Sequence, residues 1–243
     1  MNKKSLIYRC EQIIRDLAND IAGSIHDKPF KETVIKKLKF SKLDDWNVLC
    51  SLMDVLSDTE LAKENFLKYS LTGPTKILDY GEQYLRLYGL VNAIYLQKSA
   101  LISFIELVKL RGKKEIINKI ESLKLIELRH VVGAHTIDFL DNGTRNPHQL
   151  QRAMLEGRII KTSDSRGNFK EYDLKELLLE YNQLAEKLII EATNQFIKTV
   201  LKNGGKRKEK YLERLDAVKS AHNGAIVIWN EEGTEQFIVR IVK

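Results

Sequence analysis

Hydrophobic residues recur every three or four positions over most of the chain, a spacing that places them on one face of an α-helix. The first such series is Leu6, Cys10, Ile13, Ile14, Leu17 and Ile21. It predicts a helix over about residues 4–25. Ser41 or Asp44 would cap a second apolar segment, and Asp58 or Thr59 would restart a further helix. Since only three prolines interrupt 243 residues, these patterns predict a mainly α-helical protein.

A Thr-Gly-Pro break at residues 72–74 precedes the most apolar part of the chain. We expect a long helix there, over about residues 76–110, because residues 84–101 are apolar around most of a helical circumference. Such a helix is buried on more than one side, as at the centre of a bundle or in a subunit interface. An Arg-Gly pair ends it, and the pattern predicts the next helix over about residues 114–139.

Two segments follow a β-like pattern instead. Residues 157–172 predict a small hairpin, after which Asp173 caps a long helix that ends near residue 201. A short basic helix follows, and residues 225–242 predict a second hairpin around a Glu-Gly turn. An isolated hairpin is marginally stable in water, so this one is expected to pack on the helices or on a partner.

The predicted architecture is therefore a helical bundle with two small β-hairpin embellishments. We expect three parts. Residues 1–58 form an N-terminal helical segment that packs on the bundle, residues 59–202 form the bundle with the hairpin inserted near 157–172, and residues 203–243 form the basic helix and the C-terminal hairpin.

The positive charge of the chain is relevant to binding partners. The formal net charge is +7 and the isoelectric point is near 9.2, values that permit binding to nucleic acid. From Lys198 to Lys219 there are eight basic residues and three acidic ones. Two interpretations stay open for this stretch: a solvated helix face with a linker, or a surface that follows a phosphate backbone.

Several classes of function are not expected. No run approaches 18 consecutive apolar residues, and the N-terminus becomes charged too soon for a signal peptide, so we expect a cytoplasmic protein without a membrane span. Cys10 and Cys50 fit no metal spacing and are expected to be reduced. The sequence has no phosphate-binding glycine loop, dinucleotide fingerprint or nucleophile elbow. We therefore expect no cofactor and no metal.

Candidate chemistry is concentrated in residues 128–135, Leu-Arg-His-Val-Val-Gly-Ala-His. Arg129 can hold a phosphate, and the imidazole of His135 exchanges protons near neutral pH. Structural roles compete with this interpretation: Arg129 could pair with Glu127, Glu121 or a carboxylate on a neighbouring helix, and His135 could be a core or helix-end residue. His130 is either a third site residue or a solvent-side one. On an ideal helix His135 would lie about 120° around and about 9 Å along the axis from Arg129.

Residues 128–136 resemble the signature of the HEPN superfamily (higher eukaryotes and prokaryotes nucleotide-binding), in which Arg, usually a polar residue, and a His follow at this spacing. The preceding segment, residues 88–97, also resembles the helix before the motif in some bacterial members. The resemblance covers roughly residues 60–202. It departs from the family at His130, where Asn or Asp is common.

This resemblance implies a helical bundle, a homodimer and, in active members, a metal-independent endoribonuclease used in toxin–antitoxin or anti-phage systems. A dimer would bring two copies of the motif together across a two-fold axis. The first hypothesis is therefore a dimeric ribonuclease in which Arg129 stabilises the phosphate, His135 transfers protons and His130 orients the RNA. An antitoxin or a defence-complex subunit is a further possible partner. The rival hypotheses are a non-catalytic module that binds RNA, nucleotide or protein, and an assembly protein in which the motif is incidental.

Overall fold

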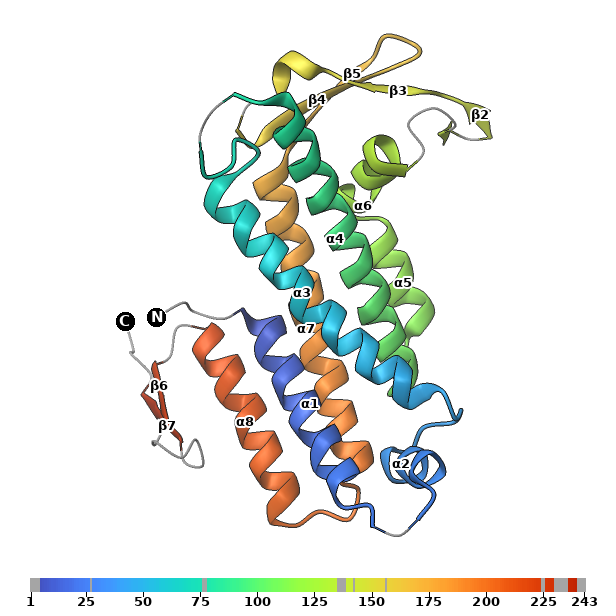
Figure 1. The fold of residues 1–243 in the computed structure, drawn as a ribbon, viewed down its shortest axis with the longest axis vertical. Helices are drawn as coiled ribbons and strands as arrows, with labels where there is room; N and C mark the ends of the chain where they lie inside the picture. Colours follow the sequence, from blue (N-terminus) through green and yellow to red (C-terminus); the bar gives the residue numbers. More distant parts are fainter. Residues whose placement is uncertain are drawn as a thin grey trace. The chain divides into compact units, whose positions relative to one another are not determined.

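A computed structural model describes residues 5–26, 28–75, 78–134, 139–141, 143–155, 157–223, 226–229 and 236–239. Within these residues the protein is mainly α-helical, as predicted (Figure 1). Its α-helices are α1 (Leu6–Gly23), α2 (Phe30–Leu38), α3 (Asp45–Tyr69), α4 (Tyr80–Leu107), α5 (Lys113–Glu121), α6 (Lys124–Arg129), α7 (Leu174–Val200) and α8 (Lys206–His222). A π-helix, η1 (His130–Ala134), continues α6, and a 3₁₀-helix, η2 (Arg152–Met154), lies between strands.

The observed helices differ from the predicted ones in three places. α3 continues through the expected restart at Asp58 or Thr59, because Thr59 is buried and accepts a hydrogen bond from Gln97 instead of starting a helix. α2 was not predicted. The single helix expected over residues 114–139 is divided at Ser122, whose hydroxyl donates to the Lys119 carbonyl, and at Leu123, whose backbone is extended.

The chain divides into two compact units, described here one at a time. Unit 1 consists of residues 1–57, 101–111 and 186–243, and α1 packs against both α2 and α8 within it. Asp16 and Asp20 of α1 accept hydrogen bonds from Arg214 and Tyr211 of α8, each at 2.6 Å. The amphipathic repeat of α1 is confirmed, since its apolar positions are buried.

Unit 2 consists of residues 58–100 and 112–185. Its three-stranded antiparallel sheet has the order β3 (His148–Leu150), β4 (Ile159–Asp164) and β5 (Phe169–Asp173). The predicted hairpin is β4–β5, and Asp173 caps α7 by accepting hydrogen bonds from the backbone N–H groups of Lys175 and Glu176. A further short pair joins β1 (Leu140–Asp141) to β2 (Thr144–Arg145).

The predicted C-terminal hairpin is present as β6 (Ile226–Trp229) paired with β7 (Gln236–Val239). The division of the sequence into three parts stays a prediction.

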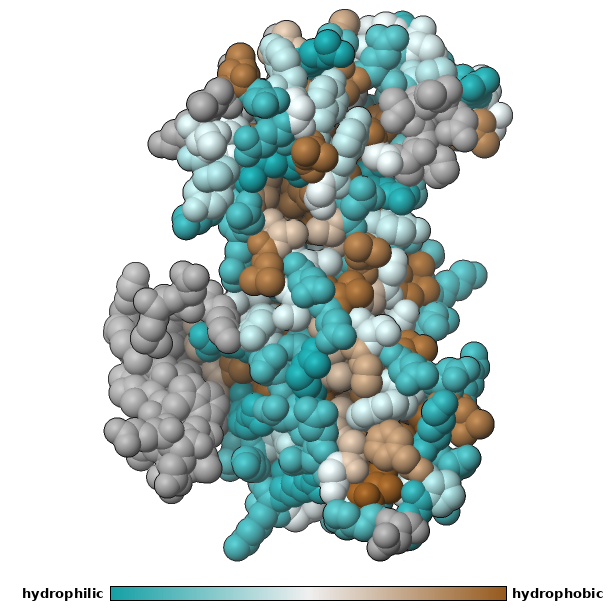
Figure 2. Space-filling view, in the orientation of Figure 1, coloured by the Kyte–Doolittle hydropathy of each residue, from teal (hydrophilic) through white to brown (hydrophobic). Residues whose placement is uncertain are grey.

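The apolar helix α4 is the one described helix that is long and apolar enough to cross a membrane. Of its most apolar 18-residue window, 56% is buried inside the protein, which is the position of a core helix. Leu87, Val91 and Ile94 are buried, whereas Leu85 and Leu96 are exposed. On the face of the molecule seen in Figure 2, hydrophobic residues form separate groups among polar ones.

Candidate functional site

Arg129 is the last residue of α6 and its guanidinium stacks on an aromatic ring of α4. The guanidinium carbon lies 3.9 Å from the centroid of the Tyr95 ring. The ammonium of Lys98 lies 4.3 Å from the same centroid and is paired with Glu121 at 2.7 Å. The ring therefore interacts with two cations, and this stacking fixes the plane of the Arg129 guanidinium.

The positive charge of Arg129 has no carboxylate partner within the described residues. Both glutamates that the sequence offered as partners are engaged elsewhere, Glu121 with Lys98 and Glu127 with Lys170 at 2.9 Å. The Nε atom of Arg129 is buried and makes no hydrogen bond in the described part of the chain. This guanidinium is thus oriented by Tyr95 but keeps hydrogen-bonding capacity for another group.

A π-helix begins at the residue after Arg129. In η1 the backbone bonds run from i to i+5, a rare geometry that occurs frequently at functional sites. Gly133 allows η1 to approach α4 closely, because a Cβ at this position would lie 3.2 Å from a methyl group of Val91. Residues 130–134 therefore do not follow the ideal α-helix from which the motif spacing was calculated.

The structure brings two of the three predicted site residues together. His130 is half-buried, and its ring lies edge-on to Tyr95 with the centroids 6.5 Å apart, so Arg129 and His130 contact the same aromatic ring. The third residue, His135, lies outside the described residues.

Three further polar side chains, which sequence reasoning missed, gather on one face of the β3–β5 sheet. The side chains of His148, Thr162 and Tyr172 are buried, and none of their polar atoms makes a hydrogen bond of normal geometry within the described residues. We call these three residues the sheet seam. Apart from His148 being one of five histidines, the sequence carried no signal for them.

The sheet seam lies close to the motif. β3 packs against η1, and Lys170 of β5 pairs with Glu127 of α6. Burial raises the pKa of Tyr172, and the carboxylate of Glu127 raises it further. His148 meets Phe139 edge-on with the ring centroids 4.9 Å apart, and only 8% of its surface is exposed. Buried polar atoms without a hydrogen bond of normal geometry therefore occur both on Arg129 and on the sheet that contacts η1.

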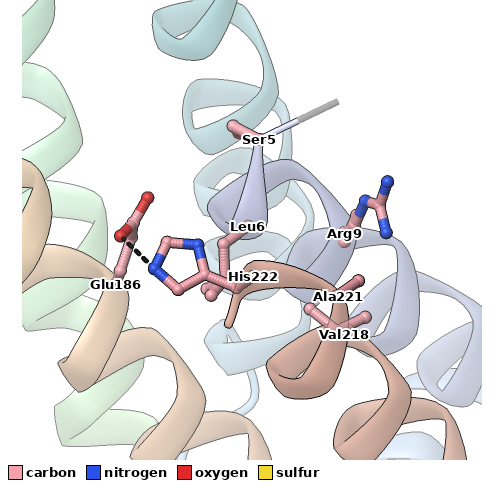
Figure 3. A pocket seen from close by; sticks show the side chains of 7 residues that line it. All are labelled: Ser5, Leu6, Arg9, Glu186, Val218, Ala221 and His222. Carbon is pink, nitrogen blue, oxygen red and sulfur yellow. Dashed lines mark ion pairs between the residues drawn. The ribbon is translucent and has the colours of Figure 1, made fainter. Parts of the chain in front are cut away.

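Unit 1 contains a cavity of about 210 Å³ between α1, α7 and α8 (Figure 3). It is lined by Ser5, Leu6, Arg9, Glu186, Val218, Ala221 and His222. The Nε2 atom of His222 lies 3.3 Å from a carboxylate oxygen of Glu186. The cavity contains none of the predicted site residues.

Within the described residues, no group of three or more His, Cys, Asp or Glu side chains has an arrangement that would hold a metal ion.

Comparison with known proteins found no match: no protein-family model, no curated protein and no solved structure matches the chain. The relation to the HEPN superfamily stays a resemblance, carried by residues 128–136 and the helices around them.

Proposed function

We propose that this protein is a metal-independent endoribonuclease of a bacterial defence or toxin system, acting in the cytoplasm as a homodimer. The observation that carries the proposal is the Arg129 guanidinium, stacked on Tyr95 with no carboxylate partner in the described chain, immediately before a π-helix that starts with a histidine. An oriented cation beside an imidazole is what phosphodiester cleavage by an internal hydroxyl requires.

Each motif residue then has a chemical role. Arg129 donates charge-assisted hydrogen bonds to the phosphate as negative charge develops on its oxygens. His135 takes the proton from the 2'-hydroxyl as that oxygen attacks the phosphorus, or gives a proton to the leaving 5'-oxygen. His130, which shares the Tyr95 ring with Arg129, orients the RNA.

A second copy of the chain has a surface to occupy on α4. The helix leaves Leu85 74% exposed, Leu96 52% and Tyr88 39%, at positions that share one face with Gly89. A Cβ built on Gly89 meets nothing within 4 Å, so another helix can approach closely there. Tyr95 follows on the same helix, so a dimer formed through this face would place the two Arg129 sites near the two-fold axis.

The test is cleavage of RNA by purified protein in the presence of EDTA. We expect Arg129→Ala and His135→Ala to abolish cleavage, His130→Ala to weaken it, and the exposed-lysine control Lys119→Gln to match the wild type. The same active-site substitutions should relieve any growth arrest on expression. Wild-type activity that survives both Arg129→Ala and His135→Ala would refute the proposal.

A second function is supported by the way in which the cations are held. Both Lys98 and Arg129 are fixed on one ring, which also suits a non-catalytic module that binds RNA, a nucleotide or a protein such as an antitoxin. That function predicts RNA binding with steep salt dependence, weakened by Arg129→Ala, and no cleavage under any condition.

A further inference from the structure

The eight basic residues from Lys198 to Lys219 fall into two groups in the structure. Three of its cations are neutralised by aspartates: Arg207 by Asp20, Arg214 by Asp16 and Lys219 by Asp216. The other five have no ion-pair partner in the described chain, and we call them the turn surface: Lys198, Lys202, Lys206, Lys208 and Lys210. Four of the five are exposed, and Lys208 is half-buried.

Helix stability does not account for these lysines. Lys206, Arg207 and Lys208 occupy the first turn of α8, where the helix dipole is positive, and the N-cap Gly205 contributes no side chain. A cation in this position is unfavourable. Only Glu209 in that turn opposes them. A patch that the fold disfavours points to a partner with negative charge.

The spacing of the turn surface fits an extended chain of phosphates. Lys206 and Lys210 are four residues apart in α8, so this pair lies on one helix face about 6 Å apart along its axis. Lys198 lies in the last turn of α7, and Lys202 lies in the turn that follows that helix. Positive-φ glycines at 204 and 205 make the sharp turn that joins the two pairs. Lys39, which is also exposed, adds a sixth cation near α7, because its neighbour Phe40 stacks on Phe196 with ring centroids 6.2 Å apart.

We propose that the turn surface binds the phosphate backbone of RNA without reading its sequence. A membrane surface is the less suitable partner, since membrane-binding helices combine basic residues with an exposed apolar face, and residues 198–210 expose no large apolar side chain. The surface belongs to unit 1, whereas Arg129 belongs to unit 2. The choice of RNA as the polyanion rests on the proposed function. The inference that the turn surface binds a polyanion is independent of that function.

The experiment measures binding of a fluorescent RNA with 2'-O-methyl ribose throughout, which cannot be cleaved by 2'-hydroxyl attack. The test variant carries Lys198→Gln, Lys202→Gln, Lys206→Gln and Lys210→Gln. Its control carries Lys31→Gln, Lys119→Gln, Lys175→Gln and Lys187→Gln, four exposed lysines elsewhere, so the two proteins have the same net charge. Each lost phosphate contact should reduce the slope of log affinity against log salt by about 0.7 for a single strand. We expect a lower slope and at least about tenfold weaker binding for the test variant only.

Each other outcome decides against the proposal. Equal slopes for the two variants would show that only net charge matters. A lower melting temperature for the test variant with unchanged RNA binding would assign the lysines to folding. If the test variant lost binding to phosphatidylserine vesicles but kept RNA binding, the partner would be a membrane. Arg129→Ala removes one phosphate contact and should lower the salt slope by no more than about 0.7, much less than the fourfold lysine variant. Wild-type protein that binds this RNA but never cleaves unmodified RNA would refute the ribonuclease and not the turn surface.

Discussion

Unit 2 contains two clusters of buried polar side chains that satisfy their hydrogen bonds very differently. The first is a closed network of Thr59, Glu60, Lys63 and Gln97, each at most 4% exposed. The Gln97 amide donates to Thr59 at 2.9 Å and to Glu60 at 2.6 Å, and its carbonyl accepts from Lys63 at 3.0 Å. Lys63 also pairs with Glu60.

The second cluster is the sheet seam together with the Nε atom of Arg129. Here no buried polar atom makes a hydrogen bond of normal geometry within the described residues, although the hydroxyls of Thr162 and Tyr172 interact. Buried polar groups are nearly always paired, so a group of unpaired ones in one place needs an explanation. The closed network is explained by the fold alone. The unpaired groups of the sheet seam are explained if water, substrate or a partner supplies their hydrogen bonds. The seam lies next to the segment that carries the motif.

The largest effect should come from breaking the closed network. Lys63→Met leaves the Glu60 carboxylate buried without its cation, which we expect to lower the free energy of unfolding by about 3–5 kcal/mol in a urea titration. Adding Glu60→Leu removes the stranded charge and should restore most of the loss. A loss below about 1 kcal/mol in the single variant would show that Glu60 reaches solvent and that the network is not closed.

Next in size is the effect of altering the ring that holds Arg129. Arg129→Lys keeps the charge but loses the planar guanidinium, and we expect cleavage to fall by about 10²–10³-fold, the usual cost of one transition-state donor. Tyr95→Leu should act in the same direction through Arg129. Because both side chains are only half-buried, melting temperatures should change little, and a large fall in either would assign the pair to the fold instead.

The two clusters differ most clearly in their expected response to the same substitution, threonine to valine. Thr59→Val removes an acceptor that Gln97 uses, so the closed network should lose about 1 kcal/mol of stability. Thr162→Val removes a buried hydroxyl that interacts with Tyr172 but makes no hydrogen bond of normal geometry, so the seam should gain up to about 1 kcal/mol. Chemical denaturation of the two variants measures both signs. If the two changes have the same sign, the seam hydroxyl has a hydrogen-bond partner in solution.

Local patterns predicted those elements that local interactions determine. The amphipathic repeat gave α1, the β-like segment with its Gly167 turn gave β4–β5, and Asp173 was found from its position before an apolar helix. All three depend on residues that are close in sequence, so spacing and capping rules were sufficient.

Contacts between distant residues produced the failures. Thr59 has the sequence properties of a helix cap, yet its hydroxyl binds Gln97, 38 residues further along the chain. The π-helical turn after Arg129 follows from packing on α4, where Gly133 meets Val91. His148 joins the candidate site only because β3 folds against η1, a contact that no short motif encodes.

The smallest effect should come from a polar cluster at the exposed end of the same sheet. The Asp164 carboxylate accepts hydrogen bonds from the backbone N–H groups of Arg166 and Asn168 and from the side-chain amides of Asn168 and Asn146. These bonds, above all that from the Asn168 side chain, hold the pKa of Asp164 well below its ordinary value.

A depressed folded-state pKa stabilises the protein above the unfolded value of about 3.9, and this contribution is lost as the pH falls toward the folded value. Asp164→Asn should therefore melt slightly below the wild type at pH 7, and the difference should shrink below about pH 4. A melting difference that stays constant between pH 7 and pH 3 would show that the charge of Asp164 does not contribute to stability. In that case only the unpaired polar groups of the sheet seam would distinguish this sheet from the closed network.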